Sequence, residues 1–359
     1  MKEIVNKAYK FRIYPNNEQQ VFFAKHFGCV RFIYNHLLSV RRDAYQKDGV
    51  KLSGLECKKL IPLLKKQDEY AWLKEVNAQS LQEAALNLEK SYKRFFSPSL
   101  KSAYPSFKRK GNHESFCVPQ HFTVDVQNNQ ICIPKLKTSI KTVFHRSLKH
   151  VEKICSITIS MTPSGKYFAS INVEEAIEHK KPVSKVSPTT KTVGIDLGIK
   201  DLLVESNGTK INAPKFLRAS ERQLKKAQRR LSRKQKGSFN RNKQRIRVAV
   251  LHEKVANQRK NFLHKESKRI VDENQVIYLE SLNVQDMIKN RHLSKAISDC
   301  GWSEFVRQLQ YKSQWAGAII VQIGRWEPSS KLCSTKGCDY KHDTLKLSDR
   351  EWTCPQCNT

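Results

Sequence analysis

The sequence lacks any long apolar run. Its best stretch, residues 315–323, is short and contains Gln322, whereas a membrane-spanning helix needs about 18 apolar residues in succession. The first seven residues also lack the apolar segment that a secretory signal requires. We therefore expect a cytoplasmic protein that neither spans a membrane nor is secreted.

Acidic residues are scarce as well. Asp and Glu number 33 against 66 Lys and Arg in 359 residues, which gives a formal net charge of +33. So large an excess of one charge repels itself unless an anionic partner compensates it. Nucleic acid is the usual partner, and an anionic membrane surface is the weaker alternative. The 16 Phe, 11 Tyr and 5 Trp are enough for packed cores, which excludes a disordered chain, and the length suggests two or three domains.

The cysteines do not form the pattern of a disulfide framework. Six of the ten are scattered, whereas Cys333, Cys338, Cys354 and Cys357 fall within the last 27 residues. Four residues separate the first two of these and two separate the last two, a spacing that suits a tetrahedral zinc site with four thiolate ligands. Such a site has no open position, so we expect structural zinc. Free or redox-active thiols are the alternative.

Composition divides the chain into four stretches: residues 1–98, 99–188, 189–327 and 328–359. In the first, a short strand near residues 8–14 precedes a helix capped by Asn17, and a second helix covers about residues 78–96. The apolar residues of the first helix are Val21, Phe22, Phe27, Val30, Ile33 and Leu37. The second stretch contains short alternating strands with polar turns, which predict a small barrel or sandwich.

The third stretch predicts buried strands separated by helices. The strands lie near residues 192–204, 275–281 and 319–323, with one turn inside the first range. A very basic helical region covers about residues 217–272, with a break at Gly237 and Ser238. A loop and then an amphipathic helix over about residues 303–318 follow the second strand range.

Basic and amide side chains gather on several of these segments. Acids are too few there to neutralise the cations by pairs four residues apart, so phosphate groups are the expected partners, although a solvated basic surface is the alternative. The loop at residues 104–111 also interleaves aromatic with basic residues, as a base-stacking surface does. The candidate contacts are Gln82, Lys93, Arg94, Lys108, Arg109, Lys225, Arg229, Arg230, Arg233 and Arg245.

Two acids each follow an apolar run that predicts a strand. Asp196 ends the first strand of the third stretch, and Glu280 ends the strand that follows the basic helices. Either acid alone is more often a cap or turn residue. A pair of strand-end carboxylates in a phosphate-binding protein can instead share Mg²⁺ and activate water against a phosphodiester. Such a site normally has a third carboxylate. The candidates, none of them at a strand end, are Asp299, Asp343, Asp349 and Glu351.

Several segments together resemble the TnpB (OrfB) proteins encoded by bacterial insertion sequences. The segments are residues 9–15, 31–35, 193–200, 278–282, 293–302, 328–333 and 347–357. The resemblance covers nearly the whole chain and keeps one order. It implies an RNA-guided DNA endonuclease, often labelled a transposase, in the bacterial cytoplasm and associated with the nucleoid. The implied partners are a guide RNA made from the element's end, a target DNA and a partner transposase encoded by the same element.

The resemblance also implies an α/β multidomain fold. The four stretches become a helical recognition domain, a wedge-like β-barrel, an RNase H-like (RuvC) nuclease domain and a zinc ribbon. Asp196 and Glu280 match the first and second catalytic acids, which hold Mg²⁺. The four clustered cysteines match the zinc ligands, although the family's first cysteine pair is expected to enclose two residues rather than four.

One family feature is missing from the sequence. The third catalytic acid normally lies a few residues beyond the last cysteine pair, and only two residues follow Cys357 here. We expect this sequence to be either a piece of a longer protein or a nuclease-dead, guide-directed DNA-binding repressor. An RNA-binding protein with no DNA role is a third possibility, supported by charge alone.

Overall fold

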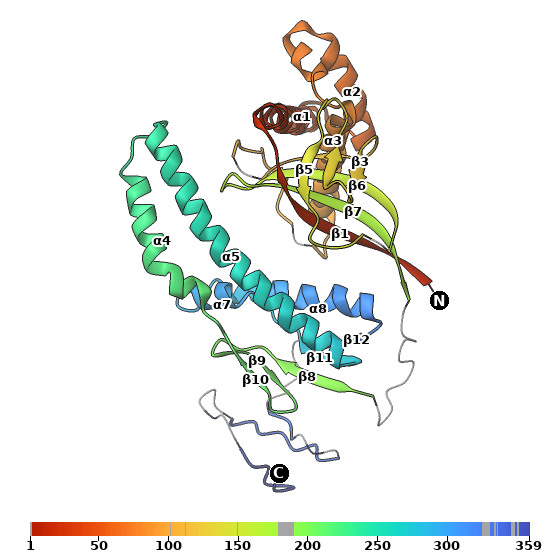
Figure 1. The fold of residues 1–359 in the computed structure, drawn as a ribbon. Helices are drawn as coiled ribbons and strands as arrows, with labels where there is room; N and C mark the ends of the chain where they lie inside the picture. The colour runs from red at the N-terminus through yellow and green to blue at the C-terminus, as the bar shows by residue number, and fades with distance from the viewer. Residues whose placement is uncertain are drawn as a thin grey trace. The chain divides into compact units, whose positions relative to one another are not determined.

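The computed structural model describes residues 2–100, 102–111, 113–148, 150–178, 190–324, 331–333, 335, 337–345, 349 and 352–359. The fold mixes α-helices with two β-sheets (Figure 1). The chain forms two compact units. The first comprises Met1–Glu178 and Ser220–Lys254, and the second comprises His179–Ala219 and Val255–Thr359. No helix among the described residues is both long enough and apolar enough to cross a membrane.

An antiparallel sheet of seven strands, in the order β2-β6-β7-β1-β5-β4-β3, organises the first unit. Its strands are β1 (Lys2–Tyr14), β2 (Glu114–Val118), β3 (Thr123–Asp125), β4 (Gln130–Cys132), β5 (Ile140–Val143), β6 (Val151–Met161) and β7 (Tyr167–Glu178). The first strand begins six residues before the predicted one because it pairs with β7 from Lys2 to Ile13. Phe11 and Ile13 are completely buried on one face, as the two-residue period of a strand requires.

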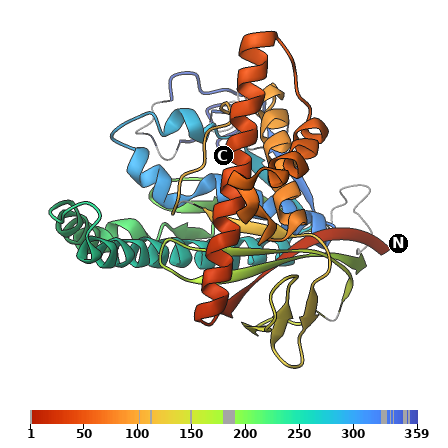
Figure 2. The same cartoon turned by 90° about the horizontal axis from the view of Figure 1, so that it is seen from above.

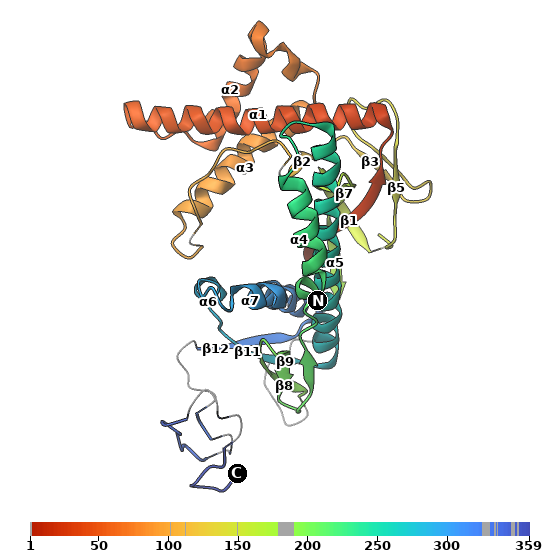
Figure 3. The same cartoon turned by 90° about the vertical axis from the view of Figure 1, so that its left-hand side faces the viewer.

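Helices cover one face of this sheet and share its core (Figures 1 and 3). They are α1 (Asn17–Asp48), α2 (Gly54–Lys66), the 3-10 helix η1 (Asp68–Lys74) and α3 (Ala78–Phe96). The helix predicted over residues 78–96 is confirmed as α3. The predicted cap Asn17 is wrong by one residue: Asn16 caps α1, because its side chain accepts a hydrogen bond from Gln19 N and the Gln19 side chain bonds back to Asn16 N. Val21, assigned to the apolar face, is 58% exposed.

The basic helical region forms a hairpin of two helices that lie side by side (Figures 1 and 2). These are α4 (Phe216–Ser232) and α5 (Phe239–Glu273), so the predicted break at residues 237–238 is confirmed. The Gln244 side chain donates a hydrogen bond to Ala227 O at 3.1 Å. The Arg241 guanidinium donates to Leu231 O and Lys234 O, at 2.7 and 2.8 Å. Arg241 thereby ties the start of α5 to the C-terminal end of α4 and the turn that follows it.

The second unit contains a five-stranded sheet in the order β10-β9-β8-β11-β12. Its strands are β8 (Thr192–Asp196), β9 (Asp201–Glu205), β10 (Lys210–Asn212), β11 (Val276–Glu280) and β12 (Ile319–Ile323). The pairs β10–β9 and β9–β8 are antiparallel, whereas β11 runs parallel to both of its neighbours, β8 and β12. The strands predicted near residues 192, 275 and 319 are therefore confirmed.

Two helices pack along one face of this sheet (Figures 1 and 3). These are α7 (Ser294–Cys300) and α8 (Trp302–Ala316), and a single turn, α6 (Val284–Met287), precedes them. The segment between β11 and α8 was predicted as loop, which is wrong for α6 and α7. Ile297, only 1% exposed, fixes α7 to the core through a contact that the polar composition of this segment conceals.

Candidate functional site

The two predicted acids lie at the ends of neighbouring parallel strands. The register pairs Leu279 of β11 with Ile195 of β8, so Glu280 and Asp196 occupy the next position on each strand. Ile195 and Leu279 are buried in the core, and successive side chains of a strand alternate between faces. Asp196 and Glu280 therefore leave the sheet on the same face, opposite that pair. Asp196 is exposed and Glu280 is half-buried.

A tight turn after β8 fixes the backbone beside Asp196. Gly198 N donates to Leu202 O at 3.2 Å, which turns the chain into β9. A Cβ atom on Gly198 would lie 2.7 Å from Asp201 O, so any side chain there would displace the turn. The Cys300 Sγ atom of α7 contacts Gly198 O at 3.9 Å. The strand end that carries Asp196 is thus supported by the helix packed against it.

Of the candidate third acids that the structure describes, none ends a strand: Asp299 lies in α7, and Asp343 and Asp349 follow β12. Both carboxylate oxygens of Asp299 accept a hydrogen bond from Leu217 N, at 3.1 and 3.0 Å, and Oδ1 lies 2.8 Å from Arg259 Nη2. Asp299 therefore serves the N-terminus of α4, where a carboxylate is favourable. Asp343 pairs with Lys341 at 3.0 Å. Glu351 lies outside the described residues.

The four clustered cysteines bring their sulfur atoms together. All four Sγ atoms lie within 4.8 Å of one another, with 3.4 Å between Cys333 and Cys357 and 3.7 Å between Cys338 and Cys354. Ligands at about 2.3 Å in a tetrahedron around Zn²⁺ stand about 3.8 Å apart, whereas a disulfide bond measures about 2.05 Å. The donor set and its spacing therefore fit zinc and not a disulfide. Within the described part of the chain, this is the only cluster of three or more candidate metal ligands from His, Cys, Asp and Glu.

Backbone bonds hold the two cysteine pairs in place. Cys333 N donates to Tyr340 O at 2.9 Å, and Cys354 N donates to Thr359 O at 2.8 Å. Hydrogen bonds with the Thr335 and Thr359 hydroxyls, 3.4 and 3.5 Å from Cys357 Sγ, lower the pKa of that thiol to about 5. Burial and the neighbouring thiols instead raise the pKa of Cys338 to about 12. Cys357 is therefore the member of the cluster that most readily forms a thiolate, which is the form that binds metal.

The candidate nucleic-acid contacts belong to the first unit. Gln82 is half-buried on α3, and the others are exposed on α3, on the loop at residues 104–111 and on the α4–α5 hairpin. The exposed residues are Lys93, Arg94, Lys108, Arg109, Lys225, Arg229, Arg230, Arg233 and Arg245. Lys225 also pairs with Glu221 at 2.8 Å, an exposed contact of small energetic weight.

Three residues of α1 hold the loop at residues 104–111 and the strand that follows it, and the sequence had suggested no role for them. The Asn35 side chain donates to Lys108 O at 2.9 Å and accepts from Lys108 N at 2.7 Å. The Lys108 ammonium lies 4.1 Å from the centre of the Tyr34 ring. Arg31 Nη1 lies 3.0 Å from both carboxylate oxygens of Glu114. The sequence feature that could have identified these residues is the segment at residues 31–35, which resembles the family and contains all three.

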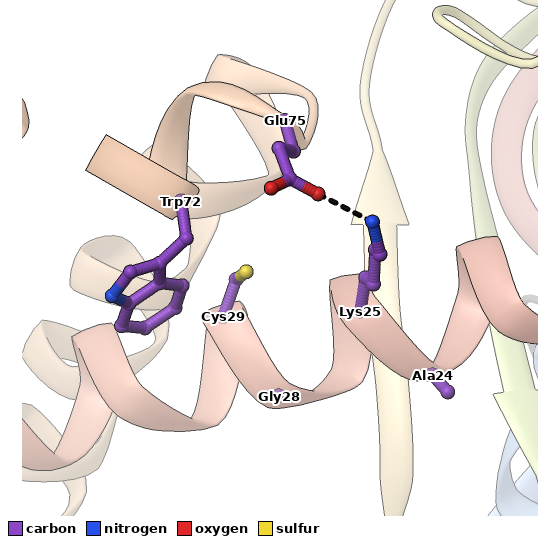
Figure 4. A pocket seen from close by; sticks show the side chains of 6 residues that line it. All are labelled: Ala24, Lys25, Gly28, Cys29, Trp72 and Glu75. Carbon is purple, nitrogen blue, oxygen red and sulfur yellow. Dashed lines mark hydrogen bonds and ion pairs between the residues drawn. The ribbon is translucent and has the colours of Figure 1, made fainter. Parts of the chain in front are cut away.

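A cavity of about 410 Å³ lies between α1 and η1 (Figure 4). Ala24, Lys25, Gly28, Cys29, Trp72 and Glu75 line it. Two of the lining residues, Lys25 and Glu75, form an ion pair at 2.5 Å. Burial raises the pKa of the Cys29 thiol to about 11. The cavity contains none of the predicted site residues, and its thiol is protonated at neutral pH.

Three segments of the chain match known protein families. Residues 170–291 match a family described as "Probable transposase" (OrfB of IS605), residues 1–50 a helix-turn-helix domain family, and residues 302–359 the Cas12f1-like TNB domain. In this chain, residues 2–50 fold mainly as β1 and α1.

Relatives extend the similarity to nearly the whole chain. A "Putative RNA-guided DNA endonuclease" of Streptomyces pristinaespiralis is 37% identical over 99% of this chain and 86% of its own length. InsQ of Escherichia coli K12, with the same description, is 28% identical over 95% of this chain and 86% of its own length. A Cas12f1–sgRNA–target DNA complex aligns with a TM-score of 0.35 and 15% identity over 99% of this chain and 95% of that one, too weak a likeness to carry an argument.

Proposed function

This chain belongs to the TnpB (OrfB) family of transposon-encoded proteins, and on that premise we propose that it is an RNA-guided DNA endonuclease. The observation that carries the proposal is the 37% identity, over 99% of the chain, to a relative described as an RNA-guided DNA endonuclease. The charge of +33 supports it, because two nucleic-acid partners would supply the missing anions. In such enzymes base pairing with the guide reads the sequence, and the protein holds the duplex by shape and charge.

Asp196 and Glu280 are the proposed catalytic acids. Their places one position beyond the Ile195–Leu279 pair, on one face of the sheet, support a shared role. Carboxylate oxygens suit Mg²⁺, and these two side chains would hold it. Bound Mg²⁺ supplies the activation of water and the stabilisation of phosphate charge in phosphodiester hydrolysis. The chain's own contribution is to fix both acids on adjacent buried strands, which removes the entropy of bringing them together.

The proposed zinc site has a structural role. Cys333, Cys338, Cys354 and Cys357 would hold Zn²⁺ with all four tetrahedral positions filled, which leaves none for a substrate. Among the residues described after β12 no helix or further strand forms, and Leu332 and Lys341 pair through an isolated bridge. We propose that zinc supplies the folding free energy that this segment cannot obtain from a core.

We also propose a domain assignment for the four stretches. Residues 1–98 would form the recognition domain, 99–188 the wedge-like domain, 189–327 an RNase H-like (RuvC) nuclease domain and 328–359 a zinc ribbon. The sheet with two acids at adjacent parallel strand ends supports the third assignment. The cysteine cluster supports the fourth.

Cleavage of a plasmid target tests the function. The whole protein encoded by the transposable element is purified together with an RNA transcribed from the element's end. The complex is then mixed with a plasmid that carries the sequence matching this RNA. We expect Mg²⁺-dependent cleavage that Asp196→Ala or Glu280→Ala abolishes, whereas Asp286→Ala, which removes an exposed acid paired with Lys289 of the same segment, leaves it intact. Guide-dependent target binding without cleavage by the unaltered protein would identify a nuclease-dead DNA-binding protein instead.

A further inference from the structure

Three exposed aromatic rings gather where α3 ends and the basic loop begins. Phe95, Phe96 and Tyr104 are 36%, 70% and 46% exposed. The ring centroids of Phe95 and Phe96 lie 5.0 Å apart, and those of Phe95 and Tyr104 lie 5.3 Å apart. We call these three residues the aromatic patch. Single exposed apolar residues are ordinary, but a contiguous group of rings marks a binding surface.

The aromatic patch rests on a fixed support. Buried Tyr92 lies beneath it, with its hydroxyl 2.9 Å from that of Tyr104 and its ring 6.3 Å from that of Phe96. The Arg41 guanidinium lies 4.1 Å from the centre of the Tyr92 ring and pairs with Glu89 at 2.7 Å. A ligand that stacks on such a pre-organised surface has little side-chain entropy left to remove.

The charge around the aromatic patch selects its partner. Residues 90–111 contain seven Lys or Arg and five aromatic residues but no Asp or Glu. Lys93 and Arg94 are exposed beside the two phenylalanines. A second copy of the chain would bring the same cations against these, which repels. A single nucleic-acid strand satisfies both features, because phosphates meet the cations and bases stack on the rings.

We propose that the aromatic patch stacks an unpaired nucleobase of the bound RNA. This rests on the proposed function, in which RNA is the resident partner and DNA arrives only as a target. An exposed group of rings favours association between protein molecules, so the partner that covers it should be the permanent one. The stacked base adds affinity without sequence preference, because every base presents a π-face.

Binding of a short RNA measures the stacking. The probe is a uridine-rich 15-nucleotide RNA with one central 2-aminopurine, whose fluorescence falls when the base stacks. We expect Phe96→Ala in the full chain to weaken binding about tenfold and to abolish the quenching. The dependence of affinity on salt should stay unchanged, because no phosphate contact is lost.

Two further variants separate ring stacking from apolar contact. Phe96→Trp should retain both the affinity and the quenching, whereas Phe96→Leu should lose the quenching. The matched control is Tyr45→Ala, a 58% exposed ring on α1, which should leave both unchanged. Equal affinity and quenching for Phe96→Ala and the unaltered protein would overturn the proposal.

Photo-crosslinking identifies the partner strand. The residue p-benzoylphenylalanine replaces Phe96, and the protein is purified with the RNA from its element's end. A crosslink to that RNA before any DNA is added supports the proposal. A crosslink that forms only to added target DNA, one to a second protein copy, or none at all overturns it. Because this experiment needs no cleavage, a failure of the proposed nuclease activity would not be mistaken for a failure of the stacking proposal.

Discussion

Asp196 and Glu280 lie side by side at the ends of two parallel strands that are separated by about 80 residues of chain, most of them in the helices α4 and α5. Like charges at neighbouring positions of a sheet repel each other. This adjacency supports our proposal that the two acids share a cation, and it makes the proposal testable through stability as well as cleavage.

Metal binding at this pair predicts a stability effect that does not depend on cleavage. Without divalent ions, Asp196→Asn should raise the unfolding temperature slightly, because it removes the repulsion with Glu280. Addition of Mg²⁺ at about 100 times its dissociation constant should stabilise the unaltered protein by about 2.7 kcal/mol. The variant should respond far less, and thermal unfolding at several Mg²⁺ concentrations measures both effects. An equal response of the two proteins would contradict shared metal binding.

The cysteine cluster predicts one tightly held zinc ion per chain. Cys354→Ser replaces a buried sulfur ligand, so zinc measured by mass spectrometry should fall well below one equivalent, and residues 331–359 should become sensitive to protease. Strong chelators should have the same effect on the unaltered protein. The control, Cys132→Ser, removes an exposed cysteine of β4 and should retain full zinc content. Unchanged zinc content in Cys354→Ser would refute the assignment of the ligand.

Buried His26 predicts a loss of stability in acid. Its Nδ1 donates to Phe22 O at 3.0 Å, its Nε2 accepts from Asn77 N at 3.1 Å, and burial lowers its pKa to about 4. Between pH 6.5 and 4 the unfolded chain binds a proton that the folded chain excludes. The free energy of unfolding should therefore fall by up to about 3 kcal/mol as the pH drops through that window.

Urea unfolding at several pH values between 7 and 4 measures the effect of His26. His26→Gln, which keeps hydrogen-bonding groups but cannot titrate, should be less stable at pH 7 and should lose this component of the pH dependence. An identical pH dependence in the two proteins would show that other groups cause the acid sensitivity.

Gly198 predicts a steric requirement beside the proposed catalytic acid. Gly198→Ala would place a Cβ atom 2.7 Å from Asp201 O, so the turn must shift. We expect a loss of about 1–3 kcal/mol in stability and a large fall in cleavage rate, because Asp196 moves with the turn. Gly194→Ala is the matched control within β8, since its nearest neighbour would be Ser206 Cβ at an ordinary 3.6 Å. Cleavage that is no slower in the first variant than in the second would refute the positioning role.

Local patterns predicted much of the fold, and long-range pairing decided the rest. The apolar runs that became β8, β11 and β12 were readable because buried strands have nearly continuous apolar sequences. The register that aligns Asp196 with Glu280 could not be predicted from the sequence, because it depends on pairing between distant segments. Two adjacent asparagines stand where α1 begins, and local sequence could not decide which of Asn16 and Asn17 caps the helix. Val21 fits the helical period, but the sheet beneath α1 selects a different face.

Ion pairs within this protein limit how strongly its binding of nucleic acid should depend on salt. Five arginines are already paired with carboxylates: Arg31, Arg41, Arg259, Arg269 and Arg307. A carboxylate offsets the charge of each of these, whereas the two carbonyl groups that accept from Arg241 leave its charge in place. The number of counterions released on binding should therefore fall short of what 66 basic residues suggest, and the complex should tolerate salt better than its composition implies.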